Sequence, residues 1–172
     1  MSFVEQEKPG TKFVIWAHNG HVSHDSNGFI NGGFHPFGSY LEEAYGDAYY
    51  SFGFAFNKGS FQAIEMDSLG NYNGLQEFTV NPAKENSLDW YYAQINQPVF
   101  IINFRSSTLP DYMKAFCAEP HDSRGSGAVM SRQTAEQAYG PCKLLVDFDG
   151  MIFINETHRS QPTETGMRKA QK

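Results

Sequence analysis

Two nearly continuous apolar runs, at residues 12–17 and 98–104, stand out from an otherwise mixed sequence. Strands covered on both faces of a sheet show such runs, whereas strands with one wet face alternate apolar and polar positions. The pattern therefore predicts a short interior strand at 12–17. It also predicts a central strand at 98–104, where Pro98 precedes the apolar residues.

Other segments predict further strands and one hairpin. The aromatic-rich residues 48–56, the turn-like residues 57–59 and the segment 60–64 together predict a strand, a turn and a second strand. Residues 75–80 alternate weakly and predict a peripheral strand, and residues 151–154 predict the last strand.

Helical spacing appears in three places. Residues 37–45 predict a helix that ends at Gly46, a residue common after the last helical turn. Residues 88–95 predict a second helix with Ser87 as its N-cap, and residues 110–116 predict a short third one. The Gly- and Asn-rich stretch 23–36 predicts a loop.

These elements predict an α/β fold with a mixed, partly parallel sheet flanked by helices. At 172 residues the length favours one domain. We expect residues 1–11 to be an N-terminal lead, residues 12–159 to form the folded region, and the polar residues 160–172 to form a disordered tail.

Charge and composition narrow the functional classes. The net charge of -6 and the lack of a Lys/Arg cluster argue against a nucleic-acid partner. No apolar run approaches the roughly 20 residues that cross a bilayer, and the N-terminus lacks a signal-peptide pattern, so we expect no membrane partner and a cytoplasmic protein. Cys117 and Cys142 fit neither a metal-ligand spacing nor a disulfide framework.

The candidate chemistry lies in His18 and His21, three residues apart at the end of the predicted strand 12–17, with His24 close by. Three interpretations are open. Imidazoles at a strand end suit acid/base work or hydrolysis. They could instead hold a metal with Asp25, or be loop histidines held by backbone hydrogen bonds. No Gly-x-Ser-x-Gly elbow, P-loop or Gly-x-Gly-x-x-Gly turn offers other chemistry.

Four segments in the same order resemble the second half of the erythromycin esterase family. The most specific is Trp16-Ala17-His18-Asn19-Gly20-His21. The others are residues 37–47, residues 52–63, and the closing stretch that contains Arg124, Gly127 and residues 148–157. The similarity covers roughly residues 12–160.

The resemblance implies a hydrolase that opens a carboxylic ester such as a macrolactone, the chemistry of macrolide antibiotic resistance, or a relative labelled succinoglycan biosynthesis protein. It implies that histidine and glutamate assist the attack of water, with no cofactor and no metal. On this model His18 and His21 are catalytic-site residues that line the cleft. Asn19 and Arg105 are candidate substrate-binding residues, Arg105 because it follows a predicted strand end.

The chain also departs from the family. Family members are longer, and the half that carries the general-base histidine precedes the segment matched here. A general base must reach its proton within about 3 Å or through one water. We therefore expect the chain alone to be weakly active or inactive, and an uncovered face to cause self-association. The alternative is a non-catalytic fragment or binding remnant of the same fold.

Overall fold

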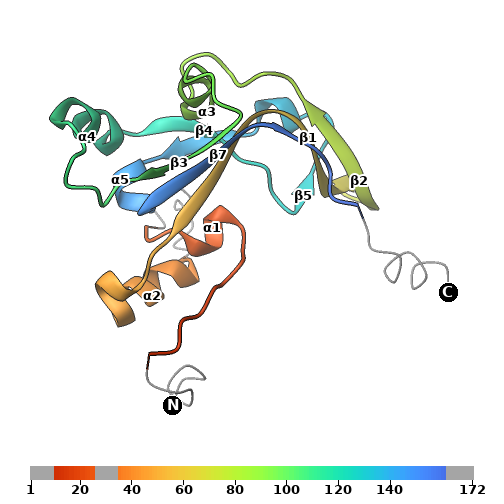
Figure 1. Cartoon of the computed structure of the whole chain (residues 1–172). Helices are drawn as coiled ribbons and strands as arrows, with labels where there is room; N and C mark the ends of the chain where they lie inside the picture. Colours follow the sequence, from red (N-terminus) through yellow and green to blue (C-terminus); the bar gives the residue numbers. More distant parts are fainter. Residues whose placement is uncertain (1–9, 26–34, 162–172) are drawn as a thin grey trace.

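The computed structural model describes residues 10–25 and 35–161 (Figure 1). The strands are β1 (Phe52–Met66), β2 (Tyr72–Val80), β3 (Val99–Asn103), β4 (His121–Arg124), β5 (Val129–Met130), β6 (Tyr139–Cys142) and β7 (Gly150–Thr157). The helices are α1 (Asn19–Val22), α2 (Phe37–Tyr45), α3 (Leu88–Ala93), α4 (Asp111–Ala118) and α5 (Leu144–Asp147), with 3-10 turns at η3 (Gly46–Ala48) and η4 (Ala135–Gln137).

The main sheet has five strands. Its order is β2-β1-β7-β3, and β5 pairs with the far end of β1. Strand β1 runs parallel to β7 and β5 and antiparallel to β2, while β3 runs antiparallel to β7. Strands β4 and β6 form a separate antiparallel pair. The predicted α/β class with a mixed, partly parallel sheet is confirmed.

The predicted hairpin within residues 48–64 is wrong, because residues 52–64 belong to the single long strand β1, while Ala48 ends the 3-10 turn η3. Gly59, expected in a turn, has φ 117° and lies so close to β7 that a Cβ would be 2.1 Å from the Thr157 carbonyl oxygen. Gly59 therefore allows two strands to approach instead of reversing the chain. The reversal comes later, where the Asp67 carboxylate accepts hydrogen bonds from the Leu69 and Asn71 amides.

Both apolar runs were assigned the wrong environment. Residues 12–17 form no strand and pair with nothing in the described sheet, and Val14 and Trp16 are 91% and 83% exposed. The second run forms β3, as predicted, but at the edge of the sheet, with Ile101 62% exposed. A continuous apolar run indicates that its side chains favour burial. It does not indicate whether other described residues of this chain bury them.

Side chains on the two faces of β1, β7 and β3 differ in how far they are buried by other parts of the chain. Ala55, Met151 and Phe153 point to the face packed by α3, α4 and α5 and are at most 4% exposed. Strand register places a second set of large apolar side chains on the opposite face: Phe52, Phe54, Phe56, Val99, Ile101, Ile152 and Ile154. None of these seven is fully buried.

The three predicted helices are present, although α3 ends at Ala93 rather than at residue 95 and α4 continues to Ala118 rather than ending at residue 116. Helix α2 has the expected bounds and is followed by Gly46 at φ 49°. Ser87 caps α3 by accepting a hydrogen bond from the Trp90 amide, and α4 starts one residue after Pro110. The predicted peripheral strand 75–80 is the second part of β2, and the last strand is β7. Most of the predicted loop 23–36 and of the predicted tail 160–172 lies outside the described residues.

Candidate functional site

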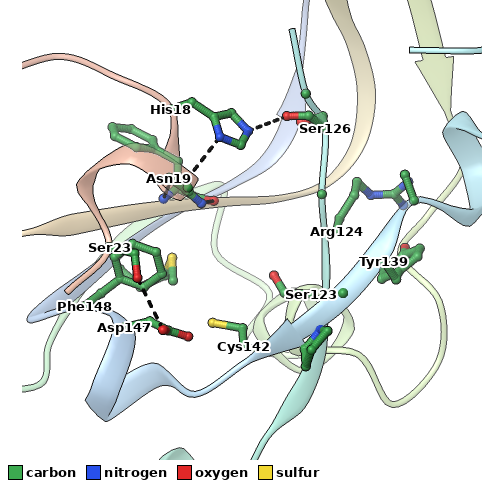
Figure 2. A pocket seen from close by; sticks show the side chains of 18 of the residues that line it. His18, Asn19, Ser23, Ser123, Arg124, Ser126, Tyr139, Cys142, Asp147 and Phe148 are labelled. Atoms are coloured by element: carbon green, nitrogen blue, oxygen red, sulfur yellow. Dashed lines mark hydrogen bonds between the residues drawn. The ribbon is translucent and has the colours of Figure 1, made fainter. Parts of the chain in front are cut away.

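A cavity of about 640 Å³ opens beside the first half of β1. One side comes from residues 16–20 with Ser23 and Asp25, and the other from residues 123–127 and β6. Figure 2 shows His18 and Ser126 meeting across it, Arg124 beside Tyr139, and Ser23, Asp147 and Cys142 gathered at one end. Aromatic and apolar groups complete the lining: Trp16, Phe54, Phe56, Phe148 and Met151. The cavity thus combines apolar walls with a few polar groups, as small-molecule sites do.

His18 connects the two sides of the cavity. As N-cap of α1 it accepts a hydrogen bond at Nδ1 from the Gly20 amide, 3.1 Å away. Its Nε2 lies 2.6 Å from the carbonyl oxygen of Ser126. Because Nδ1 accepts, the neutral ring carries its proton on Nε2 and donates it to Ser126. Both ring nitrogens are therefore engaged, with the Nε2 proton directed across the cavity.

Asn19, a predicted substrate-binding residue, attaches α1 to the open edge of β1. Its side-chain nitrogen donates to the Phe54 carbonyl at 2.7 Å, and its side-chain oxygen accepts from the Phe54 amide at 2.9 Å. These two bonds replace those of a neighbouring strand. Asn19 lines the cavity, and both polar atoms of its side chain hydrogen-bond to Phe54, which holds the loop that carries His18.

His21 is not among the residues that line the cavity. It is exposed, its ring stacks on Phe37 with centroids 6.4 Å apart, and its ring centre is 6.3 Å from that of His18. The two predicted histidines are thus neighbours on α1, but only His18 reaches the cavity.

Arg105, the other predicted substrate-binding residue, lies outside the cavity. Its Nε donates to Asp149, and its two terminal nitrogens donate to the carbonyls of Asp47 and Tyr49. The guanidinium also lies over the Tyr50 ring, 5.0 Å from its centroid. Arg105 therefore fastens the end of β3 to the starts of β1 and β7.

Asp147, which the sequence did not single out, is a buried carboxyl in the cavity lining. It accepts hydrogen bonds from the Lys143 amide at 2.7 Å and from the Ser23 hydroxyl at 3.3 Å. Burial raises the pKa of Asp147 above its usual value, although these donors oppose the shift. Burial and the nearby Asp147 also raise the pKa of the Cys142 thiol, so this cysteine is a poor nucleophile.

Arg124 is a second cavity residue with an almost fully buried side chain, 2% exposed. It lies between the rings of Phe56 and Tyr139, 5.5 and 5.1 Å from their centroids. One terminal nitrogen donates to the Asn57 and Asn81 carbonyls, which ties β4 to β1 and to the end of β2. Its sequence signal was the Arg124 to Gly127 step, which carried part of the resemblance.

Within residues 10–25 and 35–161, no group of three or more His, Cys, Asp or Glu side chains is arranged as a metal site. No helix in the same ranges is long and apolar enough to cross a membrane.

Comparison with solved structures finds the same fold in three longer proteins. A Bacillus cereus protein matches with 25% identity and a TM-score of 0.67 over 85% of this chain and 34% of its own. A succinoglycan biosynthesis protein matches with 19% identity and a TM-score of 0.65 over 83% and 32%. A mutant of the erythromycin esterase EreC, in its open conformation, matches with 18% identity and a TM-score of 0.54 over 86% and 33%.

The chain thus spans about a third of the length of each of these structures. No curated protein matches it. The family model for erythromycin esterase matches residues 1–157, which confirms the predicted resemblance. The chain belongs to the erythromycin esterase family.

Proposed function

We propose that this chain forms one side of a site that hydrolyses a carboxylic ester, with macrolactone-type esters as the first substrates to test. The observation that carries the proposal is the 640 Å³ cavity into which His18 projects from the most family-specific segment. Family membership supports the reaction class, and the apolar lining suits a large, mostly apolar ester.

The hydrogen bonds of His18 favour a positioning role over that of general base. Its Nδ1 accepts from Gly20, so the neutral ring offers a proton at Nε2 and no free lone pair. If a substrate replaced the Ser126 carbonyl, the same N–H would donate to the ester carbonyl and to the negative charge that develops on it. His21, three residues away, is proposed as a second site residue that acts from outside the present cavity.

The general base and its glutamates would come from the part of the family fold that aligns outside this chain. The relatives' greater length supports this proposal, as do the incompletely covered apolar residues on one sheet face. Such a face suits packing against another part of the fold or, failing that, a second copy.

The test is complementation. The remaining segment of a family member is mixed with this chain, and hydrolysis of erythromycin and of a simple aryl ester is followed with and without a chelator. We expect hydrolysis only in the mixture, unchanged by chelation, and lost in His18→Ala. His158→Ala, an exposed histidine outside this cavity, is the control.

A non-catalytic role for the same cavity is the second candidate, favoured by the full engagement of both His18 nitrogens. Under it the mixture assembles and binds an ester analogue but does not turn over. Turnover that needs added metal would contradict both proposals and favour histidine ligation instead.

A further inference from the structure

Strand β3 forms one edge of the main sheet (Figure 1). It pairs antiparallel with β7 over residues 99–103. Just before this pairing, the Pro98 carbonyl accepts a hydrogen bond from the Asn155 amide at 2.8 Å. Just after it, the Phe104 amide donates to the Asp149 carbonyl at 2.8 Å. The backbone groups at both ends of β3 therefore point toward β7.

These two bonds fix the direction of the other backbone groups of β3. In an antiparallel pair, residues that bond to the neighbouring strand alternate with residues whose N–H and C=O point the opposite way. Because Pro98 and Phe104 face β7, the even-numbered residues between them face β7 as well. The odd-numbered residues therefore direct their N–H and C=O to the free edge of the sheet: Val99, Ile101 and Asn103.

These outward backbone groups are almost unpaired within residues 10–25 and 35–161. The Asn103 carbonyl accepts a hydrogen bond from the Ser106 amide at 3.4 Å, and in the same ranges Val99 and Ile101 have no backbone hydrogen bond on this side. Val99 is 55% exposed and Ile101 62%. A row of free N–H and C=O groups beside exposed apolar side chains is a template for another strand.

The opposite edge of the sheet, strand β2, is protected against such pairing. It contains the charged Glu77, whose carbonyl accepts a hydrogen bond from Arg132 and whose carboxylate lies 3.9 Å from Arg159. Gly74 has φ 76°, and the pairing of β2 with β1 is irregular. Charges and irregularities keep edge strands from joining other chains. Residues 98–104 carry no charge, and the register of β3 with β7 is unbroken.

We propose that β3 is a self-association edge, where a second copy of this chain adds its own β3 antiparallel about a two-fold axis at Ile101. In this register Ile101 of each copy exchanges two hydrogen bonds with Ile101 of the second copy, and Val99 pairs with Asn103. No other two-fold register uses all three outward residues.

The charge of the chain supports a second copy as the occupant. Two molecules with a net charge of -6 repel each other, and like charges opposite each other destabilise a strand pair. The uncharged β3 lets two copies meet without such a pair. The contact uses the backbone edge and not the sheet face, so it does not depend on the proposed function. Five paired residues make a small interface, so we expect a weak dimer that forms at high concentration.

Disulfide cross-linking tests the register. The two Ile101 Cα atoms of the dimer should lie about 5.5 Å apart, within disulfide range, so Ile101→Cys should give a covalent dimer under mild oxidation. Val99→Cys lies on the same edge and face, but its two copies should be roughly 14 Å apart. We expect about ten-fold less cross-linking for this control. Cys117 and Cys142 are buried, and the wild type measures their background.

Sedimentation equilibrium tests the choice of edge. Ile101→Lys places a charge on each side of the two-fold axis and should raise the dimer dissociation constant about ten-fold or more. The matched control is Leu75→Lys on β2, because Leu75 is 61% exposed. It should leave the dissociation constant unchanged. In the wild type, amide exchange of Ile101 should slow as the protein concentration rises.

Four results would overturn the proposal. One is a wild type that stays monomeric at high concentration. Equal cross-linking of Ile101→Cys and Val99→Cys would show association without this register, as through the sheet face. An equal effect of Leu75→Lys would show that β3 is not the edge involved. Protection of the Ile101 amide that is the same at all concentrations would show that another part of the same chain covers the edge.

Discussion

The two faces of the central strands have similar apolar composition but different surroundings. Phe153, on the face packed by α3, α4 and α5, is fully buried, whereas Ile101, on the opposite face, is 62% exposed. Both residues lie in strands of the same sheet, in adjacent positions of the register. Residue type alone therefore does not distinguish them; the elements packed above each face and the edge position of β3 do.

This difference indicates which face of the sheet is buried by the chain itself and which face is available for packing against another part of the fold or a second copy. The covered face contains most of the larger core cluster, including Leu88, Leu144 and Met151. On the other face, Trp16 packs against Phe54 but is itself 83% exposed. We infer that the covered face stabilises the domain and that the open face is available for association.

Truncation of Phe153 should cause the largest loss of unfolding free energy. Phe153→Ala removes a fully buried ring and leaves a cavity, which should lower the free energy of unfolding by about 3–5 kcal/mol. Ile101→Ala, the corresponding truncation on the open face, should cost less than about 1 kcal/mol. Urea denaturation of both variants measures the difference, and equal costs would contradict the account of the two faces.

Removal of the Asn19 side chain should cause the next largest loss of unfolding free energy. Asn19→Ala leaves the amide and carbonyl of Phe54 without their partners, and we expect a loss of about 2 kcal/mol in unfolding free energy. His21→Ala, on the exposed side of the same helix, is the matched control and should change little. If Asn19→Ala has the same unfolding free energy as this control, the hydrogen bonds that attach α1 to β1 do not contribute to stability.

The Asp147 carboxyl should make stability depend on pH in a defined direction. Its folded pKa is raised above the ordinary 3.8, so its contribution is fully present below that value and is lost as pH rises through the raised pKa. Relative to wild type, Asp147→Asn should lose less stability between pH 4 and pH 7. The exposed Glu85→Gln serves as control, and a larger loss in Asp147→Asn would reverse the sign and refute the assignment.

Substitution on the open face should affect association more than stability. Ile101→Ser should change the unfolding free energy by no more than about 0.5 kcal/mol. We expect the wild type to self-associate at high concentration and the variant to do so less, as measured by size-exclusion chromatography with light scattering. A wild type that stays monomeric at high concentration would leave the open face without a role in self-association.

The sequence predicted the individual helices and strands better than it predicted which of them pair or pack together. The Ser87 cap and Gly46 were readable because each acts within one helical turn. The prediction of a strand at 98–104 is confirmed, but the prediction that it is central is wrong. Its place in the sheet depends on pairing with β7, which is distant in the sequence. Gly59 was mistaken for a turn residue because its close approach to Thr157 is a long-range property.

The candidate site was predictable only in part, for the same reason. His18 was predicted because the motif around it is local, whereas Arg124 carried part of the family resemblance but was not predicted as a site residue. Asp147 and Ser23 give no local signal, and their importance comes from burial beside each other. His21 has the same local signal as His18, yet the short α1 helix directs the two rings differently.

The most direct measurement of the central claim compares His18→Ala with His21→Ala in the complemented ester-hydrolysis assay. If the His18 cavity is the site, His18→Ala should lower kcat/KM by about 100-fold or more, the scale of a lost positioned donor, and His21→Ala should lower it less. Wild-type turnover in both variants would contradict the claim that this cavity takes part in ester hydrolysis.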